Sequence, residues 1–228
     1  MKKTTVNIVL VTMILVSSKT YSQGFVNLGF ENPQLPLNPQ FNFVAASNAI
    51  PGWAAYFITS TATNATDGVG YDNVSLGGAF IALCDTNASS SAPAPLQGTY
   101  SVLVEGSRFS TPTAAAIGQT GQIPLDTMSL LFYLSLDSNM QVTFNGQIIP
   151  LVQMGSTANY VIMGGNISSF AGQTGQLLFT ALPNVGYGLI DNIQFSPSPV
   201  PEPSVMGLSA LGSLFLVWRR RQKSSSGK

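Results

Sequence analysis

The sequence contains no histidine and only one cysteine, Cys84, among its 228 residues. Without histidine, the Ser-His and Cys-His nucleophile pairs of hydrolases cannot form, and the commonest zinc ligand is missing. A single cysteine excludes an intramolecular disulfide. Because Cys84 ends a short apolar run, we interpret it as a small core residue rather than as a reactive thiol or a lipidation site.

Charge is also scarce, since only 8% of the residues are Asp, Glu, Lys or Arg. The formal net charge is zero, but nearly all basic residues lie near the two ends of the chain. Between residues 23 and 199 the only basic residue is Arg108, and the acidic residues there are Glu31, Asp67, Asp72, Asp85, Glu105, Asp126, Asp137 and Asp191. This segment carries a net charge of −7 and would repel phosphate backbones, so we expect no nucleic acid partner.

The pattern of carboxylates gives little support for catalysis. Glycoside hydrolysis needs two carboxyl groups held about 5 to 10 Å apart. Asp67, Asp72 and Asp85 fall in polar segments where solvation or turn formation explains them, and Asp126 and Asp137 bracket a strand as turn residues. We therefore predict that the protein is not an enzyme, with a polysaccharide hydrolase as the weakest alternative.

The first 22 residues have the order of a secretory signal peptide. Lys2 and Lys3 precede an apolar segment at residues 8–16, and small and polar residues follow up to Ser22. Cleavage before Gln23 would place Thr20 and Ser22 at the positions that the signal peptidase reads. An uncleaved anchor is the alternative, but the apolar segment is short for a membrane span.

The last 29 residues show a second ordered set of signals. Pro201, Glu202 and Pro203 precede a charge-free apolar run at residues 205–218, and the basic cluster Arg219, Arg220 and Arg221 opens the tail at residues 219–228. Fourteen residues reach only about 21 Å as a helix, but proline before the run and arginine after it favour a single membrane helix with a cytoplasmic basic end.

This order resembles the PEP-CTERM sorting signal of exported bacterial proteins. The resemblance implies that a membrane protease-transpeptidase of the exosortase type processes the tail. It also implies an exported protein that is tethered to the inner membrane and then reaches the cell surface or extracellular matrix. Residues 196–204 then form a proline-rich spacer, which we expect to be stiff and extended.

The segment between the two signals has an all-β pattern. At residues 128–136 apolar residues alternate at period two, with Phe132 at the centre of the more apolar face and Tyr133 on the mixed face. Residues 140–144 continue the alternation, and Asn145-Gly146 predicts a two-residue hairpin into residues 147–149. Further strands are expected at residues 25–31, 54–60, 79–83, 100–105, 114–123, 160–163, 176–182 and 187–195. We predict one antiparallel β-sandwich at residues 23–195, with long polar connections at residues 61–78 and 85–98.

Two short motifs add a second resemblance. Residues 25–33 followed by Ile50-Pro51-Gly52-Trp53 look like the opening of galactose-binding-like β-sandwiches, and residues 189–193 look like their closing strand. The resemblance implies a jelly-roll fold of that type, in which carbohydrate-binding modules expose aromatic residues on a sheet face or at loop tips. We interpret Trp53 as a core residue, and the candidates for an exposed sugar platform are Tyr56, Tyr71, Tyr133 and Tyr160.

The same resemblance implies structural calcium, held by acidic residues of the first and last strands. The alternation at residues 187–195 places Asp191 on the inward face, where a buried carboxylate needs a partner. Glu31 is the second candidate metal ligand, although its position in the alternation points it away unless the strand ends or bulges there. The alternative is a metal-free Asp191 bonded to backbone N–H groups.

Taken together, these patterns favour a non-catalytic exported protein. We expect a module that associates with glycan or exopolysaccharide, and the alternative is a structural surface protein with no small ligand.

Overall fold

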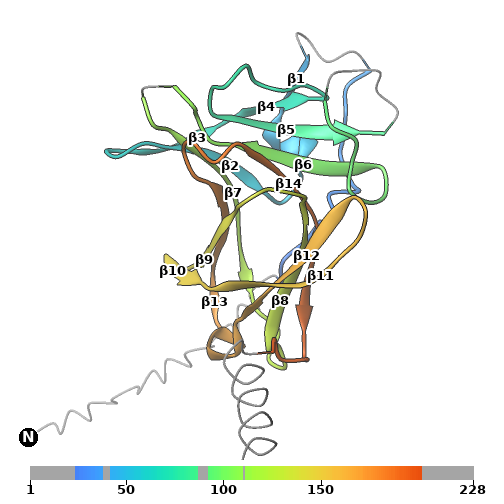
Figure 1. The fold of residues 1–228 in the computed structure, drawn as a ribbon, viewed down its shortest axis with the longest axis vertical. Coiled ribbons are helices and arrows are strands. Elements are labelled where there is room, and N and C mark those ends of the chain that lie inside the picture. The colour runs from blue at the N-terminus through green and yellow to red at the C-terminus, as the bar shows by residue number, and fades with distance from the viewer. Residues whose placement is uncertain (1–23, 38–41, 87–91, 110, 202–228) are drawn as a thin grey trace, which may run out of the picture.

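The computed structural model describes residues 24–37, 42–86, 92–109 and 111–201. Two sheets pack face to face, and in Figure 1 the six-stranded sheet lies on the left of the eight-stranded sheet. The eight-stranded sheet has the order β1-β4-β5-β6-β14-β8-β12-β11, and the six-stranded sheet has the order β10-β9-β13-β7-β2-β3. All of these pairings are antiparallel except β4 with β5, so the predicted all-β antiparallel sandwich is confirmed.

The eight-stranded sheet consists of β1 (Phe43–Ala45), β4 (Gly68–Tyr71), β5 (Phe80–Asp85), β6 (Tyr100–Glu105), β8 (Ser129–Ser135), β11 (Leu151–Ser156), β12 (Tyr160–Asn166) and β14 (Tyr187–Ser196). The six-stranded sheet consists of β2 (Ala54–Ile58), β3 (Thr63–Thr66), β7 (Ala114–Gln122), β9 (Gln141–Phe144), β10 (Gln147–Ile149) and β13 (Thr174–Ala181). Two short helical segments complete the described chain, α1 (Ala46–Ala49) and η2 (Ser168–Phe170).

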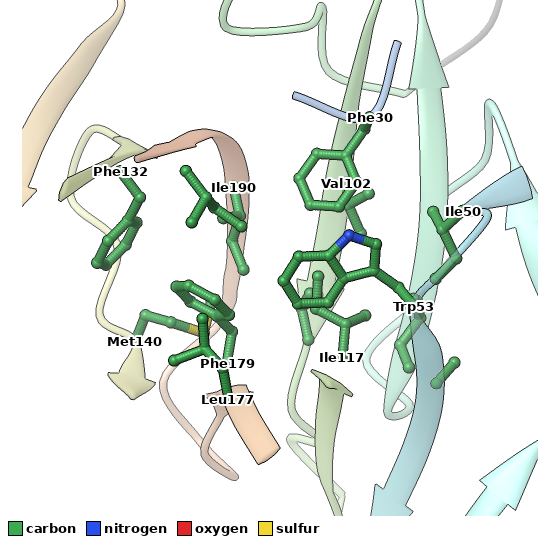
Figure 2. Close-up of a cluster of buried hydrophobic side chains, with 14 of the residues drawn as sticks. Phe30, Ile50, Trp53, Val102, Ile117, Phe132, Met140, Leu177, Phe179 and Ile190 are labelled. Carbon is green, nitrogen blue, oxygen red and sulfur yellow. The ribbon is translucent and has the colours of Figure 1, made fainter. Parts of the chain in front are cut away.

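Alternating apolar residues build the core between the sheets. Phe132 of β8 is fully buried and meets Phe179 of β13 edge to face, with ring centroids 5.1 Å apart (Figure 2). Trp53 is only 4% exposed and packs between Phe30 and Phe179, which confirms its interpretation as a core residue. Its indole N–H donates to the backbone oxygen of Asn27 at 3.1 Å, so the ring is fixed at both its apolar and its polar side.

The predicted hairpin is present. β9 and β10 pair in register around Asn145 and Gly146, which have φ angles of +48° and +77°. Both turn residues therefore adopt the left-handed conformation that asparagine and glycine accept most readily.

Residues 25–31 do not form the strand that their alternation predicts. Asn27 and Phe30 have positive φ angles, +50° and +57°, which break the extended conformation. The backbone of Val26 bonds to the side-chain amide of Gln119 in β7, at 2.6 and 3.0 Å, instead of to a neighbouring strand. The left-handed turn buries Phe30 completely, so the segment gives up sheet pairing and gains a core aromatic residue.

The polar connection expected at residues 61–78 is also wrong in part, because it contains β3 and β4. β3 pairs with β2 along an edge of the six-stranded sheet, and β4 lies between β1 and β5 in the other sheet. The polar composition of β3 is explained by its edge position, where most of its side chains are exposed.

The predicted inward orientation of Asp191 is wrong. Ile190 of β14 points into the inter-sheet core, whereas Leu189 belongs to a second apolar cluster on the outer face of the eight-stranded sheet. Asp191 has the parity of Leu189, and a register shift between Asp191 and Gln194 returns Ile193 to the inter-sheet core. Asp191 is nevertheless buried, at 2% exposure, because a loop covers that outer face.

The folded part continues beyond β14 into the predicted spacer. The backbone N–H of Met128 donates to the oxygen of Ser196 at 2.8 Å, and the Ser129 hydroxyl donates to the oxygen of Ser198 at 2.7 Å. The predicted signal peptide, membrane helix and basic tail lie outside the described residues, as do Glu202, Pro203 and the three arginines. Among the described residues, no helix is both long and apolar enough to cross a membrane.

Candidate functional site

A loop covers the outer face of the eight-stranded sheet, and its described part, residues 92–99, is called the covering loop below. Ala92 and Leu96 of this loop pack on an apolar cluster formed by Ala82, Cys84, Leu103 and Leu189. Cys84 is fully buried in this cluster, which confirms it as a core residue, and burial is the main cause that raises the pKa of its thiol to about 12.

Two carboxylates anchor the covering loop and the start of β6 to the rest of the domain. Asp191 Oδ2 accepts hydrogen bonds from the backbone N–H of Gln97 at 3.1 Å and from the Ser101 hydroxyl at 2.8 Å. Glu31 Oε1 accepts from the backbone N–H groups of Thr99 and Tyr100, at 2.9 and 3.3 Å. The loop has no regular pairing of its own, so these acceptors satisfy backbone donors that would otherwise lack partners.

Gly98 permits this contact. Its φ angle is +63°, and a β carbon at this position would overlap the carboxylate of Glu31. Any other residue would therefore displace Glu31 from the loop, in addition to the cost of the left-handed backbone.

Burial raises the pKa of the Asp191 carboxyl to about 6. The hydrogen bonds from Ser101, Asn192 and Gln97 act in the opposite direction, and the nearby charge of Glu31 adds to the increase. The dominant cause is desolvation, because the folded chain places a carboxylate under a loop without supplying a basic side chain.

The structure therefore brings the two predicted metal ligands, Glu31 and Asp191, to the same short stretch of chain. Asp191 already accepts three hydrogen bonds, including one from the Asn192 N–H to Oδ1 at 2.6 Å. Within the described ranges, no group of three or more Asp, Glu, Cys or His residues gathers as a metal site. Calcium at this position would need backbone carbonyls or waters as further ligands and stays a prediction.

A cavity of about 560 Å³ opens next to the covering loop. Its walls come from the covering loop, from Arg108, from the end of β8 and the turn that follows it, from the turn before β12, and from the start of β14 with the turn before it. The lining residues are Pro93, Ala94, Leu96, Arg108, Ser135, Leu136, Asp137, Ser138, Asn159, Asn184, Val185, Gly186, Tyr187 and Leu189. The Arg108 guanidinium forms an ion pair with Glu105 at 3.0 Å, so its charge is already partly neutralised and it would bind an anionic ligand less well.

Tyr133 of β8 and Tyr160 of β12 do not line this cavity themselves, but Ser135 and Asn159, close to them in the chain, do. Their rings stack with centroids 4.2 Å apart and an interplanar angle of 16°. Desolvation and a hydrogen bond with Tyr133 raise the pKa of the Tyr160 phenol. Each ring uses one face for its partner, so the pair can offer at most one flat surface per ring to a ligand.

The other two candidate tyrosines are separated from this cavity. Tyr56 lies on the outer face of the six-stranded sheet, where its ring packs over Gly118 and its hydroxyl accepts from Gln176 at 3.3 Å. The hydroxyl of the half-buried Tyr71 donates to the buried Asp85 at 2.6 Å, at the ends of β4 and β5.

Sequence reasoning missed the polar residues of the cavity. Asn159, Asn184 and Tyr187 occur at or next to turns, and asparagine is common in turns for purely local reasons. The sequence signal that could have pointed to these lining residues was that several turns contain residues with hydrogen-bonding side chains. Which turns meet at one end of the sandwich depends on the strand order.

Three comparisons with known proteins complete the description of the site. Residues 199–221 match the model described as the PEP-CTERM protein-sorting motif. A search of curated proteins found no match to the chain. 

Solved structures to which this chain is similar include a cyclase from Fischerella sp., with 16% identity, 78% of this chain and 98% of that chain covered, and a TM-score of 0.38. They also include a family 11 carbohydrate-binding module from Clostridium thermocellum, with 10% identity, coverage of 70% and 97%, and a TM-score of 0.36. A third is TmCBM61 in complex with β-1,4-galactotriose, with 16% identity, coverage of 77% and 99%, and a TM-score of 0.35. All three TM-scores are below 0.5. The sorting motif marks an exported protein that is anchored in the membrane before processing.

Proposed function

We propose that the exported domain is a non-catalytic glycan-binding module that associates with exopolysaccharide at the cell surface or in the extracellular matrix. The observation that carries the proposal is the cavity beside the covering loop. Its volume of about 560 Å³ falls in the range of ordinary small-ligand sites.

The chemistry of the cavity suits a sugar. Asn159, Asn184 and Ser138 offer amide and hydroxyl groups that can exchange hydrogen bonds with sugar hydroxyls. Tyr187 is 41% exposed and can provide both a ring face and a hydroxyl. Leu96 and Val185 supply apolar surface for the carbon-bound hydrogens of a pyranose ring.

Among the described residues that line the cavity, Asp137 is the one carboxylate. Glycoside hydrolysis by the usual route needs a second carboxyl group across the scissile bond. Binding without turnover is therefore the function that these residues support best.

The position of the cavity suits a protein that is anchored by its C-terminus. Tyr187 at the start of β14 lines the cavity, and the chain leaves the domain after the far end of the same ten-residue strand (Figure 1). Ten strand residues span about 33 Å, so a glycan can enter the cavity while the other end faces the membrane.

Binding of isolated exopolysaccharide tests the proposal. We expect the purified exported protein to sediment with the polymer, and Tyr187→Ala and Asn159→Ala to weaken binding about tenfold, because each removes contacts inside the cavity. Tyr56→Ala is the matched control, since it removes a tyrosine from the opposite sheet. Loss of binding in Tyr56→Ala alone would move the site to the six-stranded sheet, and no binding to any glycan on an array would favour a structural surface protein.

Processing is tested separately by intact-mass analysis of the exported protein. We propose that an exosortase-type protease removes the basic tail, so the recovered chain should begin near Gln23 and lack Arg219, Arg220 and Arg221. Replacing these three residues by Glu should disturb orientation, because they are the strongest topological signal at that end. A stable full-length protein in the cytoplasm would contradict the proposal.

We also propose a structural calcium ion at Glu31 and Asp191. Both carboxylates contact the stretch from Gln97 to Ser101, so an ion there would fix the loop that forms one wall of the cavity. Burial favours the protonated, neutral form of Asp191. A bound calcium ion would instead balance the charge of the ionised carboxylate. Its test is given with the predictions below.

A further inference from the structure

A second pair of carboxylates, Asp72 and Asp85, lies buried at the ends of β4 and β5. Their exposures are 6% and 7%, although the sequence suggested solvated loop residues. The two strands run parallel, and the Asp72 N–H donates to the Leu83 oxygen at 2.8 Å. The C-terminal ends of β4 and β5 therefore lie next to each other at the same edge of the sheet.

The two side chains differ in how they are satisfied. Asp85 Oδ2 accepts a short hydrogen bond of 2.6 Å from the Tyr71 hydroxyl. Asp72 Oδ1 lies 3.5 Å from the Asp85 N–H, which is the limit for a hydrogen bond. Among the residues that the structure describes, Asp72 Oδ2 is buried and has no hydrogen-bond partner.

The charge of Asp72 also acts on its neighbours. Burial is the main cause that raises the pKa of the Cys84 thiol and of the Tyr71 phenol, and Asp72 contributes to both increases. Asp72 therefore lies close to both Tyr71 and Cys84, at the ends of the two strands.

An unsatisfied buried carboxylate oxygen is costly, so it requires a counterion, a proton or a water. Arg108 is the only basic side chain between residues 23 and 199, and it pairs with Glu105.

We propose that Asp72 and Asp85 hold a hard divalent cation of the calcium type, at a site separate from Glu31 and Asp191. Carboxylate oxygens suit calcium, whereas zinc prefers nitrogen and sulfur ligands. Asp72 Oδ2 and the Asp85 carboxylate supply the charge, and backbone carbonyls and waters complete the shell. The ion would join the ends of β4 and β5.

Terbium luminescence in the full-length chain, purified in detergent, tests this site. Terbium replaces calcium and emits when a nearby tyrosine absorbs, and Tyr71 is bonded directly to Asp85. The Asp191→Asn variant should keep a terbium site that calcium displaces, and adding Asp72→Asn should remove it. Tyr71→Phe should reduce the sensitised emission while calcium still competes for the ion.

Controls separate this site from the first one and from loss of the fold. Asp126→Asn changes an exposed carboxylate and should leave terbium binding unchanged. Asp72→Asn is nearly isosteric, and far-ultraviolet circular dichroism checks that it folds. If Asp191→Asn binds as much terbium as the wild type while Asp72→Asn binds one ion less, only the Asp72 site exists. A folded Asp72→Asn variant with unchanged terbium stoichiometry overturns the proposal.

Discussion

The outer faces of the two sheets differ in how their polar groups find hydrogen-bond partners. The strands of the six-stranded sheet contain no charged residue, and side chains of its outer face such as Tyr56, Ile148 and Gln176 are half-buried or exposed, so we call it the open face. The eight-stranded sheet contains Asp85, Glu105 and Asp191, all buried, and a loop covers its outer face. An open face needs no special acceptors, because water satisfies its polar groups. A covered face must provide acceptors for the loop, and here they are carboxylates.

The buried carboxylates and the cavity both lie on the covered side of the domain. The carboxylates of Glu31 and Asp191 contact the covering loop or the start of β6, and the walls of the cavity include the same loop. A change on the covered side should therefore alter stability, ion binding and ligand binding together. A change on the open side should alter little.

The largest effect is expected where the two sheets share their core. Phe132→Ala should destabilise the domain by about 3–5 kcal/mol, because it removes a fully buried ring that contacts Phe179 of the opposite sheet. Tyr133→Ala, on the outer side of the same strand, should cost about 1 kcal/mol through loss of its stack with Tyr160. Urea unfolding measures both, and equal losses would show that β8 is not divided into a buried and an outer side.

The second prediction concerns the pH dependence of the covered face in excess chelator. The folded pKa of Asp191 is about 6, above its ordinary value of 3.8, so the folded state holds this proton more tightly than the unfolded state. Stability should therefore be highest below about pH 4 and fall by up to about 3 kcal/mol as the pH rises to about 6. Thermal melting across this range measures the slope, and Asp191→Asn should flatten it. A slope unchanged by that substitution would assign the effect to another group.

Calcium should reverse this behaviour. An ion at Glu31 and Asp191 favours the ionised carboxylates, so stability would no longer fall with rising pH. At about 100 times its dissociation constant, calcium should stabilise the protein by about 2.7 kcal/mol and raise the melting temperature by several degrees. If the melting temperature does not shift, and elemental analysis of untreated protein finds no metal, Asp191 acts only as an acceptor for N–H groups. Repeating the melt with Asp72→Asn separates the contributions of the two calcium proposals.

The smallest effect is expected on the open face. Gln176→Ala removes the amide that donates to the Tyr56 hydroxyl, but water can replace that bond, so the change in unfolding free energy should stay within about 0.5 kcal/mol. Chemical denaturation of this variant beside the wild type gives the value. A loss above 2 kcal/mol would mean that the outer face of the six-stranded sheet is also covered.

Much of the fold follows from local patterns that the sequence displays openly. The alternation at residues 128–136, the Asn145-Gly146 turn and the scarcity of Lys and Glu in the central segment depend only on neighbours in the chain, and they led to the correct strands and fold class. The order of proline, glutamate, apolar residues and arginines identified the sorting motif for the same reason.

Features that depend on contacts between residues distant in sequence could be seen only in the tertiary structure. Phe30 leaves the strand pattern because Gln119, far along the chain, binds the backbone beside it and the core accepts its ring. Asp191 shares the outward face of Leu189, and a bulge after Asp191 returns Ile193 to the core; alternation cannot reveal such a bulge, because one extra residue reverses the parity. Asp72 and Asp85 looked solvated since polar segments usually are, and only the pairing of β4 with β5 buries them. Local propensity determined the strands, and strand order and loop packing decided which polar groups lost their water.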